Sequence, residues 1–386
     1  MALQGQVAPS IGNLSFLSVL NLTNASLTGP IPPALGRLRR LRYLVLNQNS
    51  LSGSIPGAIG NLTSLQILDL YHNKLTGEIP PELQNLRNLM YIRLDTNQLS
   101  GPIPASMFNN TPLLSSLNLG NNSLSGPIPA SVGSLSGLKI LALQDNQLSG
   151  PVPPAIFNNS VLRVMALVKN NNLTGPIPGN ESFNLPMLQV LTLSRNDFGG
   201  RIPSGLAACR FLRILSLSYN VFDDVIPAWL PTLSQLTYVS LGGNNLAGSI
   251  PTGLHNLTQL SRHDLVESNL VGVIPADLGQ LKQLSWLNLA ANRLTGSIPA
   301  SLGNLTMVTQ LDLAHNQLDG TVPSTFGRLG VLGFLNVEGN NLGGELDFLD
   351  ALSSCRALRN LYISMNSFTG SIPDNVGNFS NNLQAS

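Results

Sequence analysis

The sequence predicts a solenoid of the α/β class. It would be a curved right-handed superhelix of short parallel strands, with 3₁₀ or irregular segments on its convex side. Three observations predict this architecture. A 24-residue pattern recurs along the chain of 386 residues, leucines two positions apart recur within the units, and charged residues are only 10% of the composition. An ordinary soluble domain carries about 25% charged residues, and a unit this short cannot close a hydrophobic core alone.

The repeat is clearest in the stretch LRYLVLNQNSLSGSIP at residues 41–56. Fifteen complete units span residues 17–382, and eleven of the fifteen are 24 residues long. A half repeat at 1–16 precedes them, and the start of a sixteenth lies at 383–386. We therefore expect a single repeat domain over residues 1–386.

Each position of the unit, counted from its first leucine, has a structural role. Positions 4 and 6 point to the same side of a strand and are expected in the core, while the residues between them face outward. The glycine of the G-x-I-P segment permits backbone conformations that other residues avoid. The proline fixes φ and suits an extended segment outside the ladder. Stacked units then give a parallel sheet with about 4.8 Å between strands.

Position 9 is asparagine in thirteen of the fifteen units, and Ala25 and Ser268 are the exceptions. A buried turn leaves backbone groups that need hydrogen-bond partners, and an amide offers both donors and an acceptor. We expect a hydrogen-bonded ladder between neighbouring units. A row of ligand-binding asparagines is the alternative.

Composition excludes several classes of protein. A net charge of +1 without a basic run lacks the electrostatic footprint of a nucleic-acid binder. No apolar run reaches the roughly 18 residues of a membrane span, and the N-terminus lacks the basic and apolar regions of a signal peptide. A hydrophobic content of 43% argues against disorder.

The two cysteines, Cys209 and Cys355, both replace a leucine of the repeat. They lie six strands apart, about 29 Å at strand spacing, whereas a disulfide needs Cα atoms within about 7 Å. We expect two buried, unpaired thiols.

The four histidines do not form a catalytic or metal site in this pattern. His72 and His315 fall on outward positions, His255 lies near the outer turn, and none has a second ligand at metal spacing. His263 takes the inward position 4, so we expect a core histidine with a local partner. No Ser/His/Asp set shares one face. We expect neither an enzyme nor a bound metal or cofactor.

Twelve Asn-x-Ser/Thr sequons occur, and ten of them are candidate glycosylation sites because of their register. A column of acceptors on the outer surface suits a secreted protein. The alternative is that the repeat simply favours the sequence G-N-L-T. Seven acceptors take position 21 on the outer arc, namely Asn13, Asn61, Asn109, Asn158, Asn256, Asn304 and Asn378. Three lie on the inner strand face, namely Asn21, Asn24 and Asn121.

Positions 2, 3, 5, 7 and 8 form a broad concave surface on which a ligand could be held. Aromatic and arginine side chains dominate binding hot spots. In the units that start at 162 to 284 the candidate ligand-binding residues are Arg163, Lys169, Arg195, Arg213, Tyr219, Tyr238, Arg262 and Trp286. A second candidate set is Tyr43, Tyr71, Tyr91 and Arg93. The alternative is that position 3 is half-buried and takes bulky residues for packing. Asp264 and Glu267 offset part of the positive charge.

The L-x-G-x-I-P segment resembles that of the plant-type leucine-rich repeat, and the resemblance covers essentially all of residues 1–386. The chain is most similar to ectodomains of plant receptor-like kinases, in the group of the rice bacterial-blight-resistance receptor and the flagellin receptor. The stretch at residues 344–358 is similar to a late repeat of the rice group, where Asp347 replaces proline and would cap a short helix. Compared with that family the chain is truncated at both ends, and it lacks the paired-cysteine cap, the membrane span and the kinase motifs.

The resemblance implies an extracellular module that recognises a peptide or protein ligand for a receptor-like Ser/Thr kinase, in immune pattern recognition. It implies a co-receptor kinase with its own leucine-rich-repeat ectodomain as a partner, and a location at the extracellular face of the plasma membrane for the full-length parent. Two alternatives stay open. One is a secreted inhibitor of microbial cell-wall enzymes, similar to the polygalacturonase inhibitors, and the other is a truncated, inactive fragment. An enzyme is disfavoured because no acid/base or nucleophile cluster is present.

Overall fold

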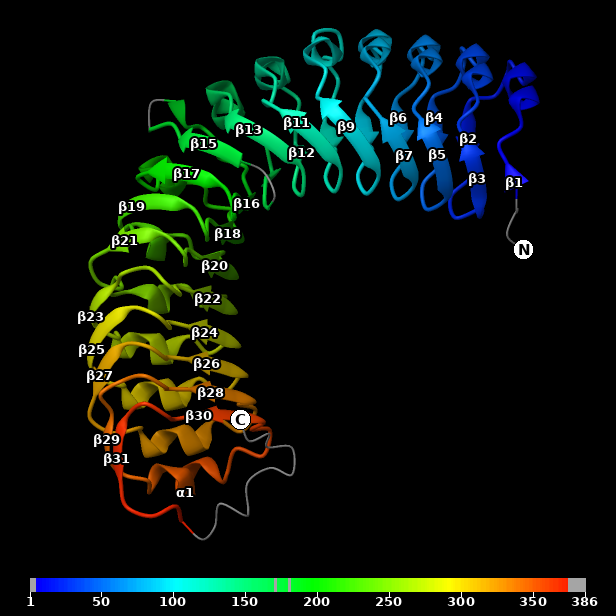
Figure 1. Ribbon diagram of the computed structural model, residues 1–386. Helices are drawn as coiled ribbons and strands as arrows, with labels where there is room; N and C mark the ends of the chain where they lie inside the picture. Colours follow the sequence, from blue (N-terminus) through cyan, green and yellow to red (C-terminus); the bar gives the residue numbers. More distant parts are fainter. Residues whose placement is uncertain (1–4, 170–171, 180–181, 374–386) are drawn as a thin grey trace. The chain divides into compact units, whose positions relative to one another are not determined.

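A computed structural model describes residues 5–169, 172–179 and 182–373 of the chain. It contains two compact units, Met1–Phe198 and Gly199–Ser386. In each unit, successive repeats stack so that short parallel strands form one face and 3₁₀ helices form the opposite face (Figure 1). We call these the strand face and the helix face. The predicted solenoid of parallel strands is confirmed.

The strand face is a ladder in which every strand covers positions 3 to 5 of its repeat. The strands pair in register, so that Leu44 lies opposite Leu68 and Tyr43 opposite Ile67. In Met1–Phe198 the strands are β2 Val19–Asn21, β4 Tyr43–Val45, β6 Ile67–Asp69, β8 Tyr91–Arg93, β10 Ser116–Asn118, β12 Ile140–Ala142, β14 Val164–Ala166 and β16 Val190–Thr192. In Gly199–Ser386 they are β18 Ile214–Ser216, β20 Tyr238–Ser240, β22 Arg262–Asp264, β24 Trp286–Asn288, β26 Gln310–Asp312, β28 Phe334–Asn336 and β30 Asn360–Tyr362.

Further parallel strands precede the I-P dipeptides, and the sequence analysis did not predict them. Gly53 has φ 73°, which turns the chain while its neighbours stay paired. Pro56 follows the ladder strand, as expected for a residue without an amide hydrogen. The strands are β1 Gly5–Gln6, β3 Leu27–Pro30, β5 Ser50–Ser54, β7 Lys74–Gly77, β9 Gln98–Pro102, β11 Ser123–Gly126, β13 Gln147–Pro151, β15 Asn172–Pro176, β17 Asp197–Gly200, β19 Val221–Val225, β21 Asn245–Ala247, β23 Val271–Val273, β25 Arg293–Ser297, β27 Gln317–Asp319, β29 Gly343–Glu345 and β31 Ser367–Thr369. Among the described residues they pair into three separate sheets, β1 to β21, β23 to β27, and β29 with β31.

The helix face consists of single 3₁₀ turns that pack closely on one another. A Cβ atom on Gly36 would collide with the backbone carbonyl of Ala58 in the next turn, so a glycine is required there. The helices are η1 Pro9–Asn13, η2 Pro33–Arg37, η3 Gly57–Asn61, η4 Pro81–Asn85, η5 Ala105–Phe108, η6 Ala130–Ser134, η7 Pro154–Asn158, η9 Ser204–Ala208, η10 Leu230–Thr232, η11 Leu254–Asn256, η12 Ala276–Gln280, η13 Ala300–Asn304 and η14 Ser324–Arg328. None of the helices in the described ranges is long and apolar enough to cross a membrane.

One repeat carries an α-helix in place of the 3₁₀ turn, α1 Phe348–Leu352. The short helix predicted after Asp347 is therefore present. The predicted capping role of Asp347 is wrong, because its side chain makes no capping hydrogen bond. Its backbone has φ −61° and ψ −23°, a helical conformation, whereas a side-chain cap requires an extended residue at that position.

The core of each unit is a stack of aliphatic columns. Leu44 and Leu46 have no exposed surface, and full burial of one such side chain contributes about 1.5–3 kcal/mol. Cys209 and Cys355 are buried and are not joined in a disulfide, as predicted from their leucine positions. Burial raises the pKa of the Cys209 thiol to about 12 and that of Cys355 to about 11, so both stay protonated.

The asparagine column is the predicted ladder. Oδ1 of Asn49 accepts hydrogen bonds from the backbone N–H groups of Ala25 and Leu27, each at 3.0 Å. Its Nδ2 donates to the carbonyls of Leu22 at 2.8 Å and Leu46 at 3.0 Å. One side chain thus joins two repeats and leaves no free amide group for a ligand. The same bonding to the preceding repeat recurs at Asn73, Asn97, Asn122, Asn146, Asn196, Asn244, Asn292, Asn316, Asn340 and Asn366.

Replacing one ladder amide should destabilise the fold. In Asn316→Ala the N–H of Leu294 and the carbonyl of Leu289 lose their partner, and each unpaired buried group costs about 1–3 kcal/mol. We expect the free energy of unfolding to fall by at least about 2 kcal/mol in urea denaturation followed by circular dichroism. The exposed Asn341→Ala is the matched control and should stay within about 0.5 kcal/mol of the parent. Equal stability of the two variants would contradict the ladder.

Asp224 takes the glycine position of its repeat and has φ 105°. Such a conformation costs a non-glycine residue about 1–3 kcal/mol, while its ion pair with Arg201 is largely exposed and contributes little. Asp224→Gly should therefore raise the free energy of unfolding by about 1 kcal/mol in the same assay. The neighbouring Asp223→Gly is the control and should lower it, because its φ is not positive. A loss of stability in Asp224→Gly would show that the residue is not strained.

Candidate functional site

The strand face displays the side chains at positions 3 and 5 of each repeat, because position 4 between them is buried. Position 3 supplies mainly aromatic and aliphatic groups, and position 5 supplies mainly polar ones. Among the described residues, this arrangement produces a hollow on the strand face of each unit. We call them the N-terminal hollow, in Met1–Phe198, and the C-terminal hollow, in Gly199–Ser386.

The N-terminal hollow, of about 400 Å³, has an apolar side and a polar side. Ile67, Tyr91 and Ile140 line it from position 3, and the exposed fractions of Tyr91 and Ile140 are 45% and 37%. The polar side comes from position 5. The lining residues are Ile67, Leu68, Asp69, Tyr91, Ile92, Arg93, Ser116, Asn118 and Ile140. A hollow of this kind fits an apolar side chain flanked by hydrogen-bonding groups.

Arg93 is held in place at the polar side of this hollow. Its Nε lies 3.1 Å from Oδ1 of Asp95, and its guanidinium carbon lies 3.8 Å from the centroid of the Tyr71 ring. Burial raises the pKa of the Asp95 carboxyl, and the positive charge of Arg93 partly opposes that shift. The two contacts fix the direction of the guanidinium before any ligand arrives.

The C-terminal hollow, of about 240 Å³, combines a cation, an indole and hydroxyl groups. It is lined by Arg262, Ser285, Trp286, Thr309 and Gln310. Oγ of Ser285 donates to the carbonyl of Ser261 at 3.0 Å, and Oγ1 of Thr309 donates to that of Ser285 at 2.9 Å. Both hydroxyls therefore use their hydrogen within the sheet. Oγ1 of Thr309 can accept from a ligand, whereas Oγ of Ser285 also lies 3.2 Å from Oγ of Ser261, which takes up part of its acceptor capacity.

Two carboxyl groups lie on strands β22 and β26 of the same face, Asp264 buried and Asp312 half-buried. Oδ2 of Asp264 accepts from Oγ of Ser240 at 3.0 Å, and Oδ1 of Asp312 accepts from the N–H of Ala314 at 3.1 Å. Burial raises the pKa of both carboxyls. Asp264 is only 7% exposed and accepts hydrogen bonds from Oγ of Ser240 and the N–H of Val266.

The structure brings some of the predicted ligand-binding residues together. Tyr91 and Arg93 share the N-terminal hollow, and Arg262 and Trp286 share the C-terminal hollow. Tyr43 and Tyr71 are half-buried and line neither. The other predicted residues fall in both units. Arg163, Lys169 and Arg195 are exposed in the first, and Arg213, Tyr219 and Tyr238 are exposed or half-buried in the second. The assignment of these residues to one ligand surface stays a prediction.

Several lining residues were missed because they are neither aromatic nor arginine. Asp69, Ser116 and Asn118 belong to the N-terminal hollow, and Thr309 and Gln310 to the C-terminal one. Their repeat positions, 2, 3 and 5, were the signal available in the sequence. Choosing residues by position and not by type would have found them.

The described sequon acceptors lie at the surface. Six take the predicted position 21; Asn304 is half-buried, and the exposed ones are Asn13, Asn61, Asn109, Asn158 and Asn256. Asn21, Asn24 and Asn121 are exposed beside the strand face. Asn378 lies outside the described residues. Glycosylation at these positions stays a prediction.

His263 is buried as predicted, but the expected local partner is wrong. The side chain has no exposed surface, and neither ring nitrogen has a hydrogen-bond partner among the described residues. The ring replaces a leucine between apolar columns. Burial lowers its pKa to about 4, and the nearby backbone of Val239 opposes this shift only weakly.

Comparisons with known proteins agree with this geometry. A leucine-rich repeat region matches residues 2–150, a leucine rich repeat matches 282–342, and single repeats match 187–209, 235–257 and 357–379. The structure of the Arabidopsis receptor kinase HAESA, in complex with the peptide hormone IDA and the co-receptor SERK1, is 31% identical, with a TM-score of 0.72. The alignment covers 97% of this chain and 70% of that one.

The chain belongs to the leucine-rich-repeat family. Its repeats are also similar to those of the ectodomain of the receptor kinase GASSHO1/SCHENGEN3 from Arabidopsis thaliana, solved in complex with CASPARIAN STRIP INTEGRITY FACTOR 2. That structure is 35% identical with a TM-score of 0.85, and the alignment covers 98% of this chain and 48% of that one. The chain therefore spans about half the length of this relative. The leucine-rich-repeat fold resembles an ectodomain and is not that of a catalytic domain.

The fold alone does not fix a ligand. A leucine-rich-repeat protein of the bacterium Leptospira interrogans, LIC12759, is 27% identical with a TM-score of 0.72, and the alignment covers 94% of this chain and 88% of that one. A comparison with curated proteins finds no match. Function must therefore be argued from the strand face itself.

The buried imidazole of His263 should make this leucine-rich-repeat domain sensitive to acid. Its pKa is lowered to about 4 in the fold, below the value of about 6.5 expected in the unfolded chain. The unfolded chain therefore binds the proton first, and stability present above about pH 6.5 is lost as the pH falls toward 4, by up to about 1.4 kcal/mol per pH unit. His263→Leu should remove this part of the pH dependence in urea titrations at pH 7.0, 5.5 and 4.5.

The same variant should be more stable than the parent at pH 7, because it replaces an unpartnered buried polar group by the leucine typical of the position. The exposed His315→Leu serves as the control and should keep the acid sensitivity. An unchanged pH profile in His263→Leu would show that His263 does not cause it.

Proposed function

We propose that this chain is the extracellular ligand-recognition region of a plant receptor-like Ser/Thr kinase, in which residues 1–386 form one leucine-rich-repeat domain. Its strand face holds an extended peptide or a segment of a protein. The parent protein acts in immune pattern recognition, as the resemblance to the rice bacterial-blight-resistance and flagellin receptors implies.

The observation that carries this proposal is the amphipathic N-terminal hollow. An exposed tyrosine and two isoleucines stand beside an arginine whose direction is fixed by Asp95 and Tyr71. The exposed apolar groups are not needed for the core, which the leucine columns already fill. A preorganised cation beside an apolar hollow suits a ligand residue with an apolar side chain and a nearby acceptor.

The solved relatives support the class of ligand and of partner. HAESA was solved with a peptide hormone and with the co-receptor SERK1, and the receptor RGFR1 was solved with RGF2. We infer a peptide or protein ligand for this chain and a co-receptor kinase with its own leucine-rich-repeat ectodomain. The exposed sequon acceptors support an extracellular location.

Substitutions in the two hollows should weaken ligand binding. The probes are synthetic plant peptides, including CASPARIAN STRIP INTEGRITY FACTOR 2, RGF2 and IDA. Each is titrated into the chain, and binding is measured by calorimetry. For a peptide that binds, Tyr91→Ala or the double variant Arg262→Ala/Trp286→Ala should raise the dissociation constant at least tenfold, because buried aromatic and arginine contacts are hot spots worth about 2 kcal/mol or more. Both variants should keep the unfolding midpoint of the parent.

Phe211→Ala is the matched control, because this aromatic side chain is 53% exposed and precedes the strand face in its repeat. It should leave peptide affinity within twofold. If a peptide binds the parent and all the strand-face variants with the same dissociation constant, the assignment of the site is wrong. Inhibition of a fungal polygalacturonase without any peptide binding would favour the inhibitor alternative.

A further inference from the structure

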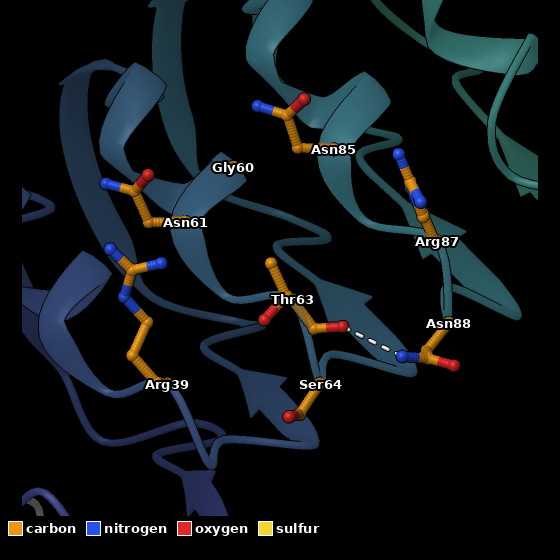
Figure 2. Close-up of a pocket in the computed structure, with 8 residues that line it drawn as sticks. All are labelled: Arg39, Gly60, Asn61, Thr63, Ser64, Asn85, Arg87 and Asn88. Carbon is orange, nitrogen blue, oxygen red and sulfur yellow. Dashed lines mark hydrogen bonds between the residues drawn. The ribbon is translucent and has the colours of Figure 1, made fainter.

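Another hollow lies away from the strand face, at the edge where the chain passes from a 3₁₀ helix to the next strand. It has a volume of about 590 Å³ and belongs entirely to Met1–Phe198. Figure 2 shows Arg39 on one side and Arg87 on the other, with Thr63 between them. The lining residues are Arg39, Gly60, Asn61, Thr63, Ser64, Asn85, Arg87 and Asn88. We call this the edge hollow.

The edge hollow carries positive charge that the protein does not neutralise. Neither Arg39 nor Arg87 has an ion-pair partner among the residues that the structure describes. Arg37 and Arg42 lie close by in sequence and donate to the amide oxygens of Asn13 and Gln66, at 3.5 and 3.2 Å, and neither has a carboxylate partner among the described residues. An anion that binds here can contact either guanidinium group without first displacing a carboxylate of the protein.

The remaining lining is amide, hydroxyl and glycine, without one apolar side chain. Asn88 is fixed by a hydrogen bond from its Nδ2 to the carbonyl of Thr63 at 2.9 Å, which leaves its Oδ1 as an acceptor. Amides and hydroxyls both donate and accept, as the hydroxyls of a sugar ring require. Guanidinium groups bind carboxylates through paired hydrogen bonds. Such a lining offers nothing to an acyl chain or an apolar peptide side chain.

We propose that the edge hollow is a binding site for an acidic oligosaccharide that bears carboxylates on its sugars. Arg39 and Arg87 occupy the same position two repeats apart, roughly 10 Å at strand spacing, so one chain of sugars meets both cations. Asn61 lines the same hollow and is a sequon acceptor. A glycan attached to it occupies the site, so the acidic ligand binds only to chains that lack this glycan. The site is separate from the proposed peptide surface.

The test titrates a defined polyuronate, an oligogalacturonate of ten sugars, into the Asn61→Gln chain at low salt. Arg39→Gln/Arg87→Gln in that background should raise the dissociation constant at least tenfold. The matched control is Arg210→Gln/Arg356→Gln, which removes two exposed arginines from the same repeat position elsewhere and should change it less than twofold. Affinity should fall with added salt, and the glycosylated Asn61 chain should bind more weakly than Asn61→Gln.

Three results would overturn the proposal. The first is that the two double variants bind the polyuronate with equal affinity. The second is that the fully methyl-esterified oligosaccharide binds as tightly as the unesterified one. The third is that the chain binds phosphoinositide-containing vesicles and does not bind the polyuronate. Peptide titration of Arg39→Gln/Arg87→Gln separates this site from the strand face. That variant should bind strand-face peptides like its parent, whether or not the polyuronate binds.

Discussion

The structure depends on backbone groups that each repeat cannot satisfy by itself. The turn after a strand-face strand buries N–H and carbonyl groups, and in most described repeats an asparagine from the next repeat supplies their partners, as Asn49 does for Ala25 and Leu22. Because an unpaired buried group costs about 1–3 kcal/mol, a repeat without its neighbour is unstable. Stacking in register follows from this need, and the leucine columns then become continuous.

Because the repeats stack in register, the position of a residue within its repeat determines the surface on which its side chain lies. Positions 3 and 5 meet on the strand face, and the residues before each strand meet at the edge, so that side chains one or two repeats apart become neighbours. Tyr91 and Ile140 share one hollow for this reason, and Arg39 and Arg87 share another. Function is therefore carried by the positions that the repeat leaves variable, since the conserved spacing of leucine and asparagine is used for folding.

Departures from the repeat have local physical costs. His263 puts an unpartnered ring into a leucine column, and Asp224 adopts a backbone conformation that the other repeats give to glycine. Ser268 lacks the amide of the ladder, and its hydroxyl donates to the carbonyl of Val266 within its own repeat at 3.2 Å. Neighbouring repeats stay in register around each of them, which shows that the stack tolerates single faults.

The sequence by itself determined the solenoid, the buried leucines, the asparagine ladder and the absence of a disulfide between the two cysteines, because each follows from a periodic pattern whose chemistry is local. It also placed the strand-face positions. Only the tertiary structure decided which of those residues form hollows, that Arg93 is held by Asp95 and Tyr71, and that a basic hollow exists at the edge. Cavities and ion pairs depend on contacts between side chains of different repeats, and the periodicity of the sequence does not determine those contacts.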